Sequence, residues 1–407
     1  MRFYQHNMRI KVLIASHKIG AGHKALGDTF YEQLKKDRRF DVKHFIREGG
    51  AGDKFYSLYI KYPLFLQEAM SVPQELPFCD IQESIKTPHM FIQSYRILKD
   101  ENPDIVLSTR FSQTQHFAVA KRILKLPTVI INAVPDYGAP SRKDYPFLNY
   151  FKPDYLFVME KDSLYQAIKK FNIDKQKVKL LGIMTKKEFR DVKSRFKNKE
   201  EARKRIKVIF KHVDLYHNID VSKGTVLVLG GSKASTKTFP LIREIAKSGN
   251  QIFNQAQYFV ICGRNVKFYN KLIKLKKSDE DYKNIFPFPF LQTYQIALVM
   301  YGANFPILGS IAPTTLNELL ETECVPFLIH RYIFHEKPHI GYIQKNKIGL
   351  YKPNLHGCLN ALENYLKMTP ESIGKVIDRA RNIRKSHKKY FENLPDFLTE
   401  IYLNNVR

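Results

Sequence analysis

Cysteine is scarce in this sequence of 407 residues, which contains four of them. Cys79, Cys262, Cys324 and Cys358 stand far apart, and no two have the short spacing of zinc ligands. The sequence therefore indicates neither a zinc site nor a disulfide framework, and we expect a reducing, cytoplasmic setting.

Long apolar runs are also missing. The apolar run near the N-terminus is about five residues long, which is shorter than the core of a signal peptide. No stretch approaches the roughly 20 apolar residues of a membrane-spanning helix. We therefore expect any membrane contact to be peripheral, on the inner face of the membrane.

Acidic residues are too few to balance the basic ones. The chain has 39 Asp and Glu against 67 Lys and Arg, which gives a formal net charge of +28. Such an excess predicts an anionic partner, either membrane lipid, nucleic acid or a phosphorylated substrate. Because no RNA- or DNA-binding signature is found and the aromatic residues lie in apolar runs, we expect no nucleic acid.

The most informative stretch that is present covers residues 11–25. An apolar, β-branched run predicts a buried strand, Gly20 and Gly22 form a tight turn, and a helix pattern begins at His23. The N–H groups at such a helix start suit an anion, and an imidazole there can accept a proton from a hydroxyl. A catalytic site is one interpretation of this stretch.

Two other interpretations stay open at this point. Gly20, Gly22 and Ala25 also fit the dinucleotide pattern, for which Asp41 or Glu48 would supply the acidic partner, as in an NAD-dependent oxidoreductase. The third interpretation is a purely structural turn that His23 caps.

The first half of the chain alternates strand and helix patterns, which is typical of a parallel α/β sheet. Further strands are predicted over residues 40–46, 105–109, 128–132, 155–158 and 178–181. Asp136 follows one of them and is expected at the carboxyl edge, where such sheets bind ligands. We assign residues 1–185 to an N-terminal Rossmann-like domain.

The second half repeats the pattern over residues 224–407. Strands over 225–229 and 258–262 end at Gly230-Gly231-Ser232 and at Gly263-Arg264-Asn265, and neither turn is a P-loop. Residues 373–402 predict one or two basic helices with a break at Pro395, and these last helices are candidates to pack back on the first domain.

Between the two domains, residues 186–223 are dense in lysine and arginine. A basic linker or a solvated helix face is the leading interpretation, and contact with an anionic surface is the second.

A helix pattern after residue 312 carries hydroxyls and a carboxylate. Thr314 and Thr315 can cap the helix and leave N–H donors for a phosphate, while Glu318 can accept from the vicinal hydroxyls of a ribose. Ordinary capping is the alternative. After the next predicted strand, over 325–329, a loop carries His335 and Glu336, whose polar groups would face the cleft between the domains.

Residues 55–66 combine aromatic and aliphatic side chains with flanking lysines. This mixture is expected of a helix in a headgroup layer and equally of a buried helix, and the pattern does not separate the two. In the first case Phe55, Tyr59, Tyr62 and Phe65 would contact the acceptor or the membrane.

Taken in order, these motifs resemble those of the family 28 GT-B glycosyltransferases. The resemblance is to monogalactosyldiacylglycerol synthase and processive diacylglycerol glucosyltransferase, and to the related transferase that makes peptidoglycan lipid II. It runs from Lys11 to about Gly349 and is carried by Gly20-Ala21-Gly22-His23, Gly230-Gly231-Ser232, Cys262-Gly263-Arg264-Asn265, Thr314-Thr315-Leu316-Asn317-Glu318 and Phe334-His335-Glu336. It implies a GT-B fold, two Rossmann-like domains facing a cleft.

The resemblance also implies an activity, the inverting transfer of a hexose from a UDP-sugar to a membrane lipid hydroxyl, most readily that of diacylglycerol. No cofactor and no metal are implied, since the UDP-sugar is a substrate. His23 would be the general base with Asp136 as its support. The residues implied for the donor are Gly22, Gly230, Gly231 and Ser232 at the diphosphate, Gly263, Arg264 and Asn265 near the nucleotide, Thr314 and Thr315 at the phosphates, Glu318 on the ribose, and His335 and Glu336 on the sugar.

Two departures from the family pattern stand out. Ala312-Pro313-Thr314 replaces a glycine-rich turn, and His335 replaces a glutamine in the sugar loop. Altered specificity or lost activity, in a basic relative that binds a membrane or nucleic acid, is therefore an alternative. An oxidoreductase would leave the second glycine-turn domain without a role, so we prefer the transferase.

Overall fold

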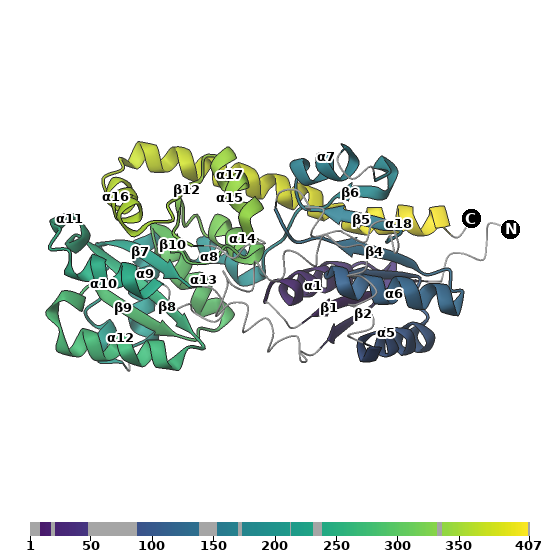
Figure 1. Ribbon diagram of the computed structural model, residues 1–407, viewed down its shortest axis with the longest axis horizontal. Helices are drawn as coiled ribbons and strands as arrows, with labels where there is room; N and C mark the ends of the chain where they lie inside the picture. Colours follow the sequence, from purple (N-terminus) through teal and green to yellow (C-terminus); the bar gives the residue numbers. More distant parts are fainter. Residues whose placement is uncertain are drawn as a thin grey trace. The chain divides into compact units, whose positions relative to one another are not determined.

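The structure is a computed structural model in which residues 9–17, 21–47, 88–137, 153–169, 173–211, 213–230, 238–331 and 336–405 are described. The chain divides into two units, of which unit 1 comprises Met1–Met184 and Ser386–Arg407, and unit 2 comprises Thr185–Lys385. Each unit contains a six-stranded sheet (Figure 1).

The sheet of unit 1 is parallel throughout and has the order β2-β1-β3-β4-β5-β6. Its strands are β1 (Ile10–His17), β2 (Phe40–Arg47), β3 (Ile105–Ser108), β4 (Val129–Ala133), β5 (Tyr155–Val158) and β6 (Val178–Leu180). Leu13, Val106 and Ile130 of neighbouring strands pack with Phe117 in one buried cluster. Helices cover this sheet because its central strands are apolar on both faces.

In the described part of unit 1, a helix follows each of β1, β2, β3 and β5 in the sequence. The helices are α1 (Ala21–Leu34), α5 (Pro88–Glu101), α6 (Phe111–Leu124), α7 (Lys161–Lys169), the short η2 (Lys175–Lys177), and, at the end of the chain, α18 (Leu394–Asn405). Helices α5 and α6 pack against each other, and both are seen beside the sheet in Figure 1.

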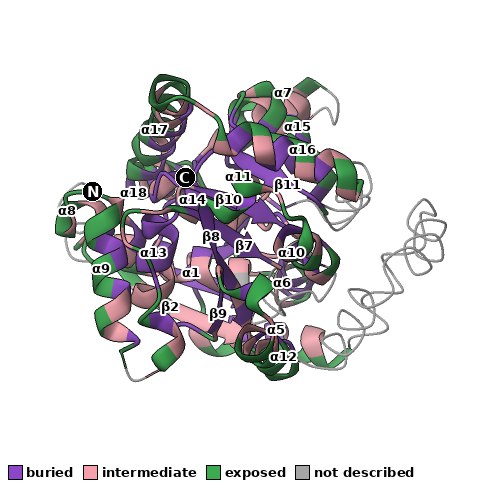
Figure 2. Ribbon diagram, turned by 90° about the vertical axis from the view of Figure 1, so that its left-hand side faces the viewer, coloured by how far each residue is buried: buried purple, intermediate pink, exposed green. Residues whose placement is uncertain are grey.

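The sheet of unit 2 is also parallel, with the order β12-β11-β10-β7-β8-β9. Its strands are β7 (Gly224–Leu229), β8 (Ala256–Gly263), β9 (Ile285–Pro289), β10 (Phe305–Leu308), β11 (Phe327–Ile329) and β12 (Gly349–Tyr351). Val228, Val260, Ile307 and Leu328 belong to its largest buried cluster. In Figure 2 the strands are largely buried, and the outward helix faces are exposed.

The helices of unit 2 surround this sheet. They are α8 (Lys187–Arg195), α9 (Lys199–Ile209), η3 (Asp214–Tyr216), α10 (Phe239–Lys247), α11 (Gln251–Asn254), α12 (Val266–Ser278), η5 (Glu280–Tyr282), α13 (Thr293–Gly302), α14 (Pro313–Glu321), α15 (Lys337–Lys345) and α16 (Leu355–Leu366). A longer helix, α17 (Pro370–Glu392), begins in unit 2 and ends in unit 1.

Much of the segment expected as a basic linker, 186–223, folds as α8 and α9 within unit 2. Helix α9 packs on α13, where the partly buried Lys199 ammonium donates to the carbonyls of Tyr301 and Ala303 at 3.1 and 2.6 Å. Arg203 donates to the carbonyl of Gly302 at 2.8 Å. These cations therefore satisfy the free carbonyls at the end of α13.

The segment from Ser386 onward joins unit 1 through its side chains. The ring of Phe391 stacks on that of Phe30, with the two ring centres 5.8 Å apart. The backbone N–H of Ile183 donates to Nδ1 of His387 at 3.0 Å. Gly182 has a φ of +73°, and a Cβ there would lie 2.4 Å from the His387 carbonyl oxygen. Only glycine fits where these two stretches of chain meet.

Several sequence predictions concern properties of the whole chain. Within the described residues, no helix has the length and apolarity that a membrane crossing requires, and no group of three His, Cys, Asp or Glu could hold a metal ion. Cys262, Cys324 and Cys358 are buried free thiols. Phe55, Tyr59, Tyr62, Phe65, Gly231, Ser232 and His335 lie outside the described residues.

Candidate functional site

The carboxyl edge of the unit 1 sheet holds the histidine that the sequence singles out. Gly22 and His23 lie in the first turn of α1, directly after β1. Nδ1 of His23 is 2.7 Å from the carbonyl oxygen of Thr109, which follows β3, and the Thr109 hydroxyl donates back to the His23 carbonyl at 3.2 Å. Because a carbonyl only accepts, Nδ1 carries the proton and the lone pair of the neutral ring is on Nε2.

Asp136 follows β4 by three residues and is partly buried. Since β1, β3 and β4 are parallel neighbours, their carboxyl ends lie at the same edge as the start of α1. The structure thus brings Asp136 and His23 to one edge of one sheet.

A polar chain beneath α1 was not foreseen from the sequence. The Ser16 hydroxyl is 2.8 Å from Nε2 of His44, whose Nδ1 lies 3.7 Å from the Asp28 carboxylate. Lys24 pairs with the same carboxylate at 2.8 Å. A Cβ at Gly27 would lie 2.7 Å from Nε2 of His44, so glycine lets α1 approach β1 closely.

The Ser16, His44 and Asp28 side chains have the order of a serine-hydrolase triad, but their setting differs. Ser16 is fully buried, and α1 lies over it at Gly27. A nucleophile must be reached by its substrate, which this serine is not. The three residues therefore fix α1, and with it His23, on the sheet.

In unit 2, β7 and β8 end in the glycine turns noted in the sequence. Gly230 follows β7, and Gly263 ends β8 with a φ of +53°. The exposed Arg264 guanidinium lies 5.1 Å from the ring centre of Phe290. Asn265 caps α12, because its Oδ1 accepts from the N–H of Phe268 at 3.0 Å.

Helix α14 begins directly after the turn that follows β10. Thr314 and Thr315 lie in its first turn, and the N-cap residue Ala312 offers no side-chain acceptor to the first N–H groups. Burial raises the pKa of Glu318 from 4.5 to about 8, although Lys186 opposes the shift. The helix therefore presents free donors at its start and a largely desolvated carboxyl one turn further on.

The start of α15 is tied to the turn between β10 and α14. The Ser310 hydroxyl donates to Oε1 of the buried Glu336 at 2.6 Å, and Nδ1 of His339 lies 2.7 Å from the Ile311 carbonyl oxygen. The sequence predicted Glu336 but missed Ser310. Ser310 lies just after β10 and shortly before α14, the helix that carries Thr314 and Thr315. This position is the signal that would have identified it.

The far side of α14 is anchored by charged side chains. Arg384 donates from Nη1 to Oδ1 of Asn317 at 2.5 Å and from Nε to Glu321 at 2.9 Å. The Thr185 hydroxyl donates to the same Glu321 carboxylate at 3.2 Å. The first and the last few residues of unit 2 thus hold the helix that carries Thr314 and Glu318.

No family model matches the chain, and a search of the curated proteins finds no matching sequence. Among solved structures, a glycosyltransferase from Rickettsia africae covers 98% of this chain and 99% of its own, with 13% identity and a TM-score of 0.59. The Neisseria meningitidis UDP-GlcNAc 2-epimerase bound to UDP-GlcNAc covers 93% and 100%, with 12% identity and a TM-score of 0.57.

A third match is the Methanocaldococcus jannaschii UDP-GlcNAc 2-epimerase in complex with UDP-GlcNAc and UDP. It covers 93% of this chain and 99% of its own, with 14% identity and a TM-score of 0.52. These proteins share two Rossmann-like domains over nearly the whole chain. The fold is GT-B.

Within the GT-B fold, the described site residues gather at the carboxyl edges of the two sheets. Gly22, His23 and Asp136 lie in unit 1, and Gly230, Gly263, Arg264, Asn265, Thr314, Thr315, Glu318 and Glu336 lie in unit 2. Carboxyl edges are where open α/β sheets bind their ligands.

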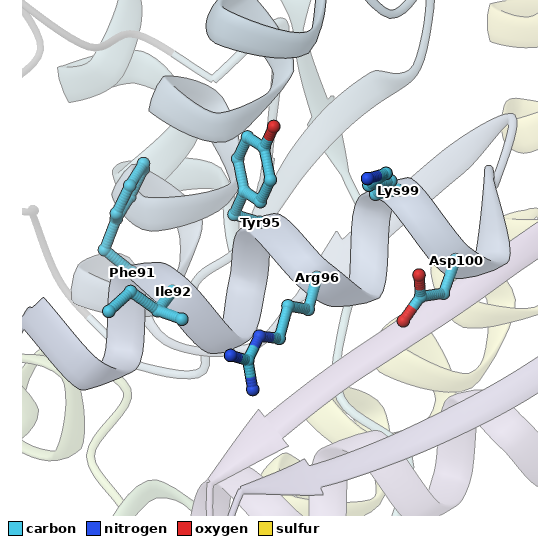
Figure 3. Close-up of a pocket in the computed structure, with 6 residues that line it drawn as sticks. All are labelled: Phe91, Ile92, Tyr95, Arg96, Lys99 and Asp100. Atoms are coloured by element: carbon cyan, nitrogen blue, oxygen red, sulfur yellow. The ribbon is translucent and has the colours of Figure 1, made fainter.

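A separate groove lies on α5 in unit 1. It has a volume of about 570 Å³ and is lined by Phe91, Ile92, Tyr95, Arg96, Lys99 and Asp100. Figure 3 shows Tyr95 and Arg96 on opposite sides of the helix. The described residues that line it all belong to α5, so this groove is separate from the residues at the carboxyl edge of the sheet.

Proposed function

We propose that this protein transfers a hexose from a UDP-sugar to the hydroxyl of a membrane lipid with inversion, and that diacylglycerol is the acceptor to test first. The hydrogen bond between His23 Nδ1 and the Thr109 carbonyl carries the proposal, because it sets the ring as a base through Nε2. The GT-B fold and the family 28 motifs support it. Asp136 is proposed to support the imidazolium that forms.

The UDP-sugar is proposed to bind at the carboxyl edge of the unit 2 sheet. The free N–H groups at the start of α14 and the hydroxyls of Thr314 and Thr315 would stabilise the charge on the departing diphosphate. Glu318 would bind the ribose hydroxyls, and Glu336, held by Ser310, would bind the sugar. Gly230, Gly231, Ser232 and Arg264 are proposed to contact the diphosphate and nucleotide.

The membrane part of the proposal rests on charge. A formal net charge of +28 favours an anionic lipid surface, and we propose a peripheral location on the inner face of the membrane. Phe55, Tyr59, Tyr62 and Phe65 remain the proposed apolar contacts.

A second candidate is the epimerisation of a UDP-sugar. The two epimerases compared above are bound to UDP-GlcNAc, and they match more than nine-tenths of this chain. An epimerase would need no lipid acceptor. The two functions are therefore separated by adding or omitting that acceptor.

The first experiment compares the melting temperature with UDP, NAD and single UDP-sugars, because a ligand that binds only the native state raises it. We expect a rise with UDP and none with NAD. Each UDP-sugar is then incubated with and without diacylglycerol vesicles. A lipid-bound sugar supports the transferase, whereas a changed UDP-sugar formed without vesicles supports the epimerase.

Replacing the proposed base tests the mechanism. We expect His23→Ala to lower the turnover number by ~10²–10⁴-fold, the contribution of a general base, while the circular dichroism spectrum is unchanged. His356→Ala is the control, because His356 is an exposed histidine on α16. Normal turnover by a folded His23→Ala protein would contradict the proposed role.

A further inference from the structure

Two neighbouring strands of unit 1 end in a basic or imidazole side chain, and a third is followed two residues later by an arginine. His17 ends β1, and Arg47 ends β2 as its partner in the parallel register. On the other side of β1 lies β3, which Thr109 and Arg110 follow. The N–H of Thr109 donates to the Ala15 carbonyl of β1 at 3.0 Å, so Arg110 lies close to the ends of β1 and β2. Two arginines and an imidazole therefore lie along one edge of the sheet, and burial together with both arginines lowers the pKa of His17 to about 3.

Arg47 is buried, at 3% exposure, and its hydrogen bonds to described residues go to neutral groups. Its Nε donates to Oε1 of Gln93 at 3.0 Å, and its Nη2 donates to the Met90 carbonyl at 2.8 Å and the Ser94 hydroxyl at 3.0 Å. Burial and the nearby Arg110 lower its pKa to about 10. A buried guanidinium is normally paired with an anion, and among the described residues no carboxylate pairs with Arg47.

Helix α6 begins at this edge and buries further polar groups. Gln113, in its first turn, is 1% exposed, and in the part of the chain that the structure describes neither its amide oxygen nor its amide nitrogen has a hydrogen-bond partner. His116, one turn on, has its pKa lowered to about 4 by burial and by Arg47 and Arg110. An unpaired buried amide is costly, which indicates that a ligand supplies the missing bonds.

We infer that this strand-end cluster, defined as His17, Arg47, Arg110, Gln113 and His116, binds a phosphate group carried by the acceptor. Guanidinium and amide N–H groups match phosphate oxygens, and the start of α6 adds backbone donors. Thr109 directly precedes Arg110 of the cluster, and its carbonyl accepts from Nδ1 of His23. A phosphate bound at the cluster would therefore lie near the proposed base. The assignment to an acceptor rests on the proposed function.

The first test measures phosphate binding without catalysis. Inorganic phosphate is titrated calorimetrically into the whole protein, with UDP present to occupy the donor site. We expect binding that Gln113→Glu weakens at least tenfold, because the isosteric carboxylate repels the anion, and that Arg47→Gln weakens likewise. Lys43→Gln is the matched control, since Lys43 is exposed on the same strand and pairs with Glu101.

Equal binding by the wild type and both cluster variants would overturn the inference. If Arg47→Gln does not fold, Gln113→Glu decides alone, because it keeps the shape of the side chain. A different outcome is that the wild type binds phosphate, that the variants weaken this binding, and that the wild type does not bind UDP. This outcome would overturn the proposed function and leave the phosphate site in place.

The second test identifies the source of the phosphate. Transfer is compared on vesicles that contain phosphatidylglycerol, which has both a phosphate and free hydroxyls, and on vesicles that contain diacylglycerol. We expect Gln113→Glu to lower transfer to the phosphate-bearing lipid at least tenfold and transfer to diacylglycerol less than twofold. Equal effects on the two lipids would overturn the link to the acceptor and assign the site to free phosphate.

Discussion

Glu318 lies one turn into α14, where burial raises the pKa of its carboxyl from 4.5 to about 8. Between these two pH values the native protein keeps the proton and the unfolded chain has lost it. The native state therefore binds more protons, and the contribution of this carboxyl to stability falls as the pH rises toward 8.

Glu318→Gln removes this titration. We expect the variant to be more resistant to urea than the wild type at pH 9 and nearly equal to it at pH 5, with no ligand present. Denaturation curves at the two pH values measure the difference. A difference of the same size at both pH values would show that burial of the charge is not its cause.

Gly27 offers a second test at the scale of a residue. We expect Gly27→Ala to lower the free energy of unfolding by ~1–3 kcal/mol, because the added Cβ overlaps His44 and Ser16. Gly374→Ala, in α17, is the control, since nothing lies within 4 Å of its Cβ position. Alanine there should stabilise the helix by up to ~1 kcal/mol. Equal effects at the two glycines would argue against the close approach of α1.

At the scale of the element, α14 is held by Arg384 through Asn317 and Glu321. Arg384 is 7% exposed, so removing it leaves a carboxylate without its main partner. We expect Arg384→Ala to cost ~3 kcal/mol of unfolding free energy. Arg379→Ala, which removes an exposed bond to the Lys347 carbonyl, should cost less than about 0.5 kcal/mol.

The Arg384 variant also has a binding consequence. A loosened α14 would hold its first N–H groups less firmly, so we expect UDP affinity to fall for Arg384→Ala and not for Arg379→Ala. Calorimetric titration with UDP measures both. If the Arg384→Ala protein is destabilised but binds UDP with unchanged affinity, Arg384 does not support the proposed donor site.

Local signals predicted most of the elements. The strand that ends at His17, the helix that carries Thr314 and the break near Pro395, where α17 ends and α18 begins, all follow from short patterns of apolar residues, glycine and proline. The polar chain from Ser16 to His44 could not be predicted this way. It depends on the register of β1 with β2, which brings together residues 28 positions apart.

At the scale of the whole molecule, repetition in the sequence predicted two Rossmann-like domains, because both halves begin with a buried strand and a glycine turn, and the family resemblance implied that they form a GT-B fold. The segment expected as a linker shows the limit of that reasoning. Lys199 and Arg203 resemble solvated charges in the sequence, yet they cap the end of α13. A charge that bonds distant carbonyls has no local signature.

The formal net charge of +28 favours binding to anionic membranes. We expect binding to phosphatidylglycerol vesicles to weaken at least tenfold between about 50 and 500 mM salt, because screening shortens the reach of the basic surface. Binding to neutral phosphatidylcholine vesicles should be weak at both. Co-sedimentation measures it, and salt-independent binding would contradict an electrostatic contact.

The meeting of Gly182 and Ile183 with His387 has a consequence for the order of folding during synthesis. Phe391, Leu398 and Ile401 are buried in unit 1, but the ribosome makes them only after the whole of unit 2. The apolar surface that these side chains cover in unit 1 therefore stays uncovered until the whole of unit 2 has been synthesised.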